Sequence, residues 1–214
     1  MADAAIPPAC TAAAAADLLT DPALFAHLQQ VVRLLCASAL VPDRLKKNDG
    51  ADALLALQIA RECGEPPLTV MQNLHLVAGR AGWSVPYLIT RANRSGVFTG
   101  RIRWHVEGRG SDALAVTSRA TLADTGEKVA AEASLALARA EGWDRDTRHA
   151  RLPEPMLRDR SAAMLVRRHC PEVLLGLPTA DELDDLAAAG RSPEAPPPQT
   201  SAAEAVSVLL RAPP

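Results

Sequence analysis

Residues 66–106 read PPLTVMQNLHLVAGRAGWSVPYLITRANRSGVFTGRIRWHV, and the rest of the chain is arranged around them. The stretch predicts a short helix, a brief strand that ends in a Gly-rich turn, a helix capped by Ser84 and a second strand. It contains five arginines and no Asp or Glu. The whole chain has a net charge of −2, so this local excess of cations indicates an anionic partner.

The strand at 101–106, RIRWHV, alternates strictly between basic and apolar side chains. Trp104 shares its face with two aliphatic neighbours, so we expect it in the core rather than stacked on a ligand. Arg101, Arg103 and His105 point to the other face. A basic outer face is often only a solvated one, and this simpler interpretation stays open beside the anion-binding one.

The periodicity of the remaining chain predicts an α+β fold. We expect a small antiparallel three-stranded sheet packed with about five helices, because three β-prone runs follow one another through short turns. The strands are expected at 101–106, 114–121 and 129–135, and the main helices at 22–37, 51–63, 69–74, 84–94 and 156–169, followed by a short acidic helix from 179.

Composition divides the chain into three parts. Residues 1–20 are Ala-rich and expected to be flexible, and residues 21–189 form the core domain. Residues 190–214 are expected to be a disordered Pro-rich tail with a small apolar segment, AVSVLL. Charge divides as well: residues 80–119 hold seven arginines and two acids, whereas residues 169–214 hold two arginines and seven acids.

Several classes of protein find no support in the sequence. The four cysteines are widely spaced without a CxxC pair, and there is no signal peptide or apolar run of membrane-spanning length. A soluble cytoplasmic protein is therefore expected. There is no GxxxxGK[ST] loop, no HExxH motif and no clustered carboxylates in the central region. We expect no catalytic site and no required cofactor, with Mg²⁺ at most modulating the activity.

Arginines outside this strand are also spaced so that pairs of them lie on one face of a predicted helix. Arg91 and Arg94 are three residues apart on one predicted helix, and Arg160 and Arg167 are seven apart on another, so each pair shares a helix face. Arg80 follows a glycine in the turn, where backbone can approach a phosphate closely. Co-facial arginines on several elements favour a phosphodiester track.

Two segments resemble the RecT-type phage recombinases, which are single-strand annealing proteins. Residues 53–96 resemble the family's central block, with MQNLHLVAGRAG in place of its MQNxxxVxGRPG motif. Residues 127–143 and 152–183 resemble a second block, with MLRDRSAAMLVRRHCPEVLLGLPTADE in place of MLRYRAAAFFxRLYxPEVLMGxxTxDE. With the spacing between the blocks, the resemblance covers roughly residues 24–188.

The resemblance implies an ATP-independent protein that coats single-stranded DNA and pairs it with a complementary strand. It also implies rings or helical filaments of many copies, and a basic groove that carries the DNA. Arg80 matches the arginine of the GRPG turn, and Arg158 and Arg160 match the two arginines of MLRYR. A host single-strand-binding protein and a phage exonuclease are candidate partners, and no membrane is expected.

Three aromatic positions of the family differ here, where Asp159, Met164 and His169 replace Tyr, Phe and Tyr. If those aromatics stack on bases, annealing is weakened, and if they pack in the core, the change matters less. An alternative is therefore a RecT-like fold that acts as a protein-interaction or regulatory module without annealing activity. The expected DNA-binding residues are Arg80, Arg91, Arg94, Arg101, Arg103, Arg119, Arg158, Arg160 and Arg167.

Overall fold

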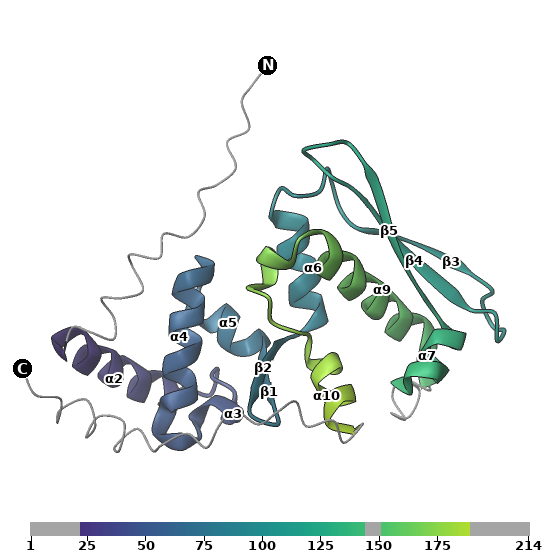
Figure 1. Ribbon diagram of the computed structural model, residues 1–214. Coiled ribbons are helices and arrows are strands. Elements are labelled where there is room, and N and C mark those ends of the chain that lie inside the picture. Colours follow the sequence, from purple (N-terminus) through teal and green to yellow (C-terminus); the bar gives the residue numbers. More distant parts are fainter. Residues whose placement is uncertain (1–21, 144–150, 189–214) are drawn as a thin grey trace, which may run out of the picture.

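The structure is a computed structural model that describes residues 22–143 and 151–188. Within these residues it has eight α-helices, a two-stranded and a three-stranded antiparallel sheet, so the predicted α+β class is confirmed (Figure 1). The expected flexible segments, 1–20 and 190–214, lie outside the described residues. No helix in the described ranges is long and apolar enough to cross a membrane.

The elements follow one another in a simple order. The helices are α2 (Pro22–Ala37), α3 (Asp43–Lys46), α4 (Ala51–Cys63), α5 (Pro67–Asn73), α6 (Val85–Arg94), α7 (Leu135–Glu141), α9 (Pro153–His169) and α10 (Ala180–Ala188), with 3-10 turns η1 (Asn48–Gly50) and η3 (Pro171–Leu174). The strands are β1 (Leu74–Val77), β2 (Arg80–Trp83), β3 (Arg103–Glu107), β4 (Ala115–Thr121) and β5 (Lys128–Ser134).

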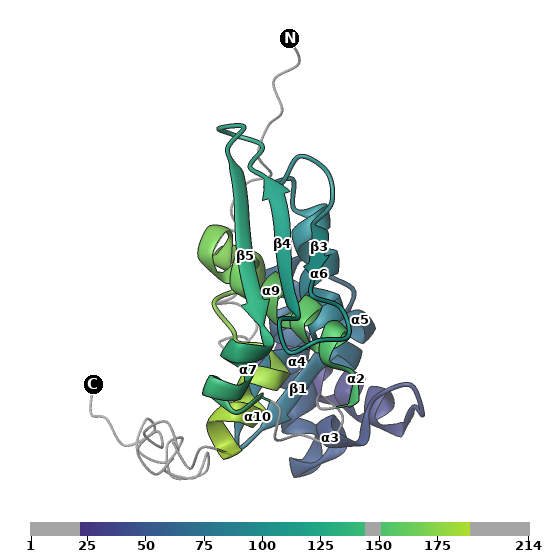
Figure 2. The ribbon, with the colours of Figure 1, turned by 90° about the vertical axis from the view of Figure 1, so that its right-hand side faces the viewer.

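The predicted meander is present as the sheet β3-β4-β5. Arg103 lies opposite Arg119, which in turn lies opposite Ala130. Helix α9 covers one face of this sheet, and Figure 2 shows the strands in front of it with their other face turned toward the viewer. The covered face carries small side chains in β4 and β5, so the helix approaches closely, and the Ser118 hydroxyl donates to the Ser161 carbonyl at 2.8 Å.

Two short helices were not predicted, and each has a local cause. α7 begins directly after β5, where the hydroxyl of Ser134 accepts from the Leu137 N–H at 3.2 Å, and it ends at Gly142 in the left-handed conformation. The alternating small residues before Ser134 hide this boundary in the sequence. α3 is a single turn between α2 and α4, where no helix was predicted from the sequence.

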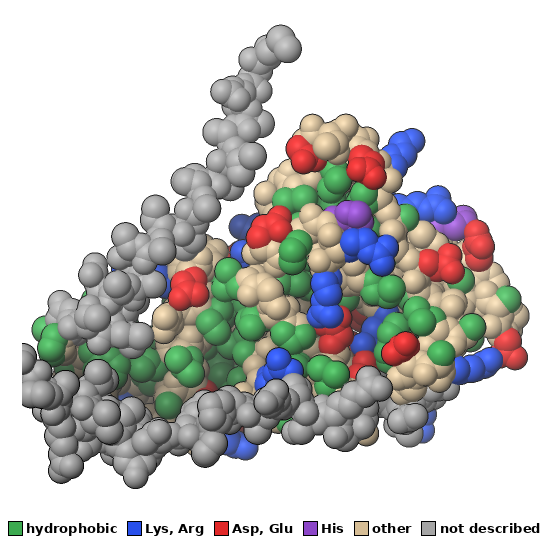
Figure 3. Space-filling model, in the orientation of Figure 1, with side chains coloured by type: hydrophobic (Ala, Val, Ile, Leu, Met, Phe, Trp, Pro, Cys, Tyr) green, Lys and Arg blue, Asp and Glu red, His purple; other side chains and the backbone are tan. Residues whose placement is uncertain are grey.

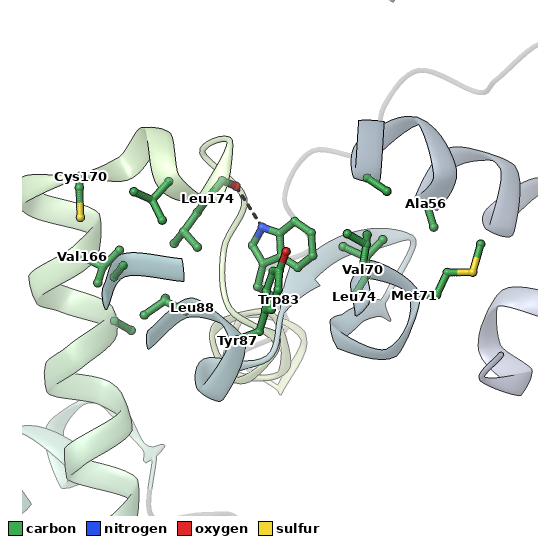
Figure 4. Packing of buried hydrophobic residues seen from close by; sticks show 14 of the residues in the cluster. Ala56, Val70, Met71, Leu74, Trp83, Tyr87, Leu88, Val166, Cys170 and Leu174 are labelled. Carbon is green, nitrogen blue, oxygen red and sulfur yellow. Dashed lines mark hydrogen bonds between the residues drawn. The ribbon is translucent and has the colours of Figure 1, made fainter. Parts of the chain in front are cut away.

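Trp83 forms the centre of the main hydrophobic core (Figure 4). Its side chain is fully buried, its ring lies 4.8 Å from that of Tyr87, and its Nε1–H donates to the Leu174 carbonyl at 3.0 Å. The backbone N–H of Trp83 donates to the Pro178 carbonyl at 2.9 Å. One residue therefore ties β2 and α6 to the segment before α10, about ninety residues further along the chain.

Ser84 occupies the predicted N-cap position of α6, but its side chain does not cap the helix. The hydroxyl donates instead to Oδ1 of Asn73 at 2.8 Å, and the Ser84 N–H donates to the Asn73 carbonyl at 2.9 Å. These two bonds close the base of the β1–β2 hairpin. The prediction of a capping role for Ser84 was therefore wrong, because the bond to Asn73 holds the hydroxyl toward the hairpin and its oxygen accepts no N–H of α6.

Gly82 allows α10 to approach β2. A Cβ at this position would lie 2.8 Å from Cδ1 of Leu183 and 3.1 Å from the Thr179 carbonyl carbon. The Thr179 backbone cannot move easily, because it bridges to Trp83. We expect Gly82→Ala to lower the free energy of unfolding by about 1–3 kcal/mol, the usual cost of overpacking. Urea denaturation measures it, and an unchanged midpoint would contradict this packing.

Candidate nucleic-acid interface

The open face of the three-stranded sheet is hollowed at one end. The concavity, which we call the cationic groove, has a volume of about 550 Å³ and is lined by all three strands and the segment before β3. Its lining residues are Thr99, Gly100, Arg101, Arg103, Arg119, Ala120, Thr121, Lys128, Val129 and Ala130. Four of these are cationic and none is acidic. Asp124 and Glu127 belong to the turn beside the groove and do not line it.

Arg103 and Arg119 are direct cross-strand partners in the groove. Both side chains are exposed on the face that points away from α9. Like charges opposite each other destabilise an antiparallel pair unless an anion lies between or above them. No Asp or Glu within residues 22–143 and 151–188 forms an ion pair with either arginine, with Arg101 or with Lys128. The groove therefore offers four cations to an external anion.

The other end of the same face has the opposite character. Glu107 lies at the end of β3, where its carboxylate contacts Nε2 of His105 at 3.1 Å, and Glu132 lies on β5 beside Thr117. Nearby, Arg139 forms an ion pair with Asp112 across 2.5 Å. This end of the face therefore carries the two carboxylates Glu107 and Glu132, whereas the groove carries only cations.

The arginines of α9 have partners inside the protein. Arg160 is 4% exposed, contacts Asp185 of α10 across 2.6 Å and lies 4.7 Å above the Trp143 ring. Arg167 forms an ion pair with Glu182, also on α10. The predicted shared face of Arg160 and Arg167 is thus present, but it is directed at the acidic helix. Both arginines are therefore engaged by α10 and do not line the groove.

Arg158 is also engaged within the chain. Its guanidinium contacts Glu154 at 2.8 Å one turn earlier, and Arg109 contacts the same carboxylate oxygen at 3.1 Å. The hydrogen bonds from Arg158 lower the pKa of Glu154, which keeps this carboxylate charged. The predicted phosphate contact of Arg158 therefore has an internal competitor.

The three arginines before the sheet do not line the groove. Arg80 is exposed at the start of β2, and Arg94 is exposed in the last turn of α6. Arg91 is half-buried beside Cys63 and Tyr87. Burial acts to lower its pKa, but these polar contacts outweigh burial and raise it. The predicted track of nine arginines is therefore reduced, at the groove, to Arg101, Arg103 and Arg119.

Lys128 is a groove residue that sequence reasoning missed. It is the first residue of β5 and lies opposite Thr121 of β4, two positions beyond Arg119. The signal was present in the hairpin TLADTGEKVA, because pairing across its turn places Lys128 on the same face as Arg119. One of only three lysines in the chain thus completes the set of four cations.

Aromatic side chains do not line the cationic groove. Trp83 and Tyr87 are buried. Trp104 is half-buried against the core, as predicted, and its Nε1–H donates to the Arg158 carbonyl at 3.0 Å. Met164, at one of the altered family positions, packs against the main core. A ligand of the groove is therefore held by charge and not by stacking on a ring.

Among the described residues, no group of three or more His, Cys, Asp or Glu side chains is placed to hold a metal ion.

No family model, curated protein or solved structure matches this chain. The geometry of the groove and the charges around it therefore carry the functional argument.

The structure assigns Arg160 a structural role, which mutation can separate from binding. We expect Arg160→Ala to lower the free energy of unfolding by about 2–3 kcal/mol, less than for a fully buried pair because Asp185 is 29% exposed. Affinity of the folded protein for single-stranded DNA should stay unchanged. Arg168→Ala, one position from Arg167 and exposed, is the control and should alter stability little. If Arg160→Ala kept wild-type stability but lost affinity for DNA, Arg160 would belong to the DNA-binding interface instead.

Proposed function

We propose that this protein binds single-stranded DNA through the cationic groove and promotes its annealing to a complementary strand. The observation that carries the proposal is the cross-strand pair of Arg103 and Arg119, which has no acidic partner among the described residues and lies in a groove with Arg101 and Lys128. A phosphodiester chain supplies the missing negative charge at regular spacing.

The chemistry of the groove favours backbone contacts over reading of bases. Arginine guanidinium groups and a lysine ammonium group contact phosphates irrespective of sequence, and no aromatic ring lines the groove. Complementarity is then tested by base pairing between the two strands. Binding by charge and pairing by bases need no nucleotide hydrolysis, catalytic site or cofactor. This mode of action agrees with the RecT-type resemblance and with a cytoplasmic location.

Removal of one groove cation should weaken binding of every DNA sequence alike. We expect Arg103→Ala to lower affinity for an unstructured oligonucleotide about tenfold at low salt. The slope of log K against log salt should fall by about 0.7, because one phosphate contact is lost from a single strand. Fluorescence anisotropy at several salt concentrations measures both quantities.

Arg33→Ala is the matched control, since Arg33 is exposed on α2 and does not line the groove. It should leave affinity and salt slope near the wild-type values. Equal losses of DNA affinity in Arg103→Ala and Arg33→Ala would show that the groove is not the DNA-binding site. Absence of wild-type binding at low salt would favour the alternative, a protein-interaction module that kept the fold without annealing.

Annealing by this class of protein implies assembly of many copies, and the surface over α2 and α4 supports this part of the proposal. Figure 3 shows hydrophobic side chains gathered there, whereas charged side chains gather over the sheet and α9. Leu34, Leu40 and Leu55 are 76%, 62% and 57% exposed. Leu24, Phe25, Leu28, Leu54 and Leu57 line an apolar groove of about 250 Å³ beside them. We propose a second copy of this chain as the partner of this surface.

Polar substitutions on this surface should reduce assembly without unfolding the chain. We expect Leu34→Ser with Leu55→Ser to shift the protein toward monomer in light scattering coupled to gel filtration, because less apolar area is buried between copies. Leu152→Ser is the control, since Leu152 is as exposed as Leu55 but precedes α9. An unchanged oligomer in the double variant would exclude this surface as the contact.

A further inference from the structure

The open face of the sheet is divided into a cationic and an acidic half, and the boundary runs across the strands. Two rows of residues, Arg103–Arg119–Ala130 and Thr121–Lys128, carry three cations, and Arg101 lines the groove beside them. The next row, His105–Thr117–Glu132, carries an acid, and so does the row Glu107–Ala115–Ser134. The charge therefore changes from positive to negative along β3 and along β5, whereas β4 passes from Arg119 to the neutral residues Thr117 and Ala115.

This division restricts how a polyanion can lie on the sheet. A chain that ran along β4 would leave Arg119 and pass over Thr117 and Ala115, with Glu132 on one side and Glu107 on the other. Each carboxylate would repel the phosphates, and no described cation on the open face of these two rows offsets them, apart from His105 in its protonated form. A chain that crossed from β3 over β4 to β5 would stay within the cationic groove throughout.

We infer that the bound DNA strand crosses the sheet at a steep angle to β3, β4 and β5. It enters the groove beside Thr99 on the β3 side and leaves it beside Ala130 on the β5 side. This inference rests on the proposed function and specifies the path of the DNA at the same site. Three strands span about 10 Å, and a stacked single strand carries one charge per ~3.4 Å, so about three phosphates face the four cations.

The path also gives the acidic half a role. Glu107 and Glu132 act as a boundary that keeps the strand in the groove and prevents it from sliding along the sheet. His105 holds the Glu107 carboxylate at 3.1 Å, on the same face of β3 as Arg103. The two acids therefore set the orientation of the bound strand and contribute no affinity of their own.

Photo-cross-linking in the full-length chain tests the path directly. Benzoylphenylalanine is placed singly at Thr99, at Ala130 and at Ala115, and each variant is irradiated with an unstructured thymidine oligonucleotide. Thr99 bonds to Thr121 from the β3 side of β4, and Ala130 pairs with Arg119 on the β5 side, so they line opposite sides of the groove. Ala115 lies on the same open face in the acidic half. We expect the probes at Thr99 and Ala130 to cross-link to the oligonucleotide and the probe at Ala115 not to. Anisotropy of each variant confirms that it still binds.

Each other outcome has a definite meaning. Cross-linking at Ala115 as strong as at Ala130, with binding retained, would overturn the crossing path and leave the proposed function standing. Failure of the wild-type chain to bind the oligonucleotide would overturn both. A second measurement does not depend on a bulky probe: Glu107→Gln with Glu132→Gln should allow cross-linking at Ala115 to appear. Its absence in a variant that binds would show that the two acids do not confine the strand.

Discussion

The close packing of α9 on one face of the three-stranded sheet is the constraint on which the rest of the structure depends. Small side chains in β4 and β5 let the helix approach, and the hydroxyl of Ser118 reaches its backbone at 2.8 Å. Because β-strand side chains alternate, burial of one face fixes the other. Arg103, Arg119 and Lys128 are thereby placed together at one end of the open face, in a groove that no described Asp or Glu lines.

A second consequence of α9 is the sorting of the arginines into two groups. Arg160 and Arg167 of α9 meet the acidic helix α10. The position of α10 is fixed by Leu183 against Gly82 and by the bond between Trp83 and Leu174. The arginines on the sheet meet no comparable partner among the described residues. A buried pair such as Arg160 with Asp185 contributes to the arrangement of the helices, whereas exposed and unpaired cations are available to a ligand.

Local patterns in the sequence predicted much of the fold. The strict alternation of RIRWHV predicted the correct facing of Trp104 and Arg103. The strand β1 was also predicted, but its partner β2 was not, because Arg80–Trp83 lies largely within the stretch expected to be a Gly-rich turn. Local patterns could not predict which distant segments pair with each other. The basic centre and the acidic C-terminal region could each be counted, but nothing local indicated that Arg160 and Arg167 would pair with α10. Lys128 was missed because the register across a six-residue turn decides its face. The resemblance to RecT-type proteins remains a hypothesis about activity, as does the groove's ligand.

Hydrogen–deuterium exchange of the full-length chain can show whether single-stranded DNA occupies the cationic groove. Exchange is compared with and without a saturating thymidine oligonucleotide. If DNA lies in the groove, exchange slows at residues 99–103, 119–121 and 128–130, and it stays unchanged in α10, whose acids face α9. Unchanged exchange in those three segments, with protection confined to α10 or to the arginines of α9, would contradict this location of the DNA.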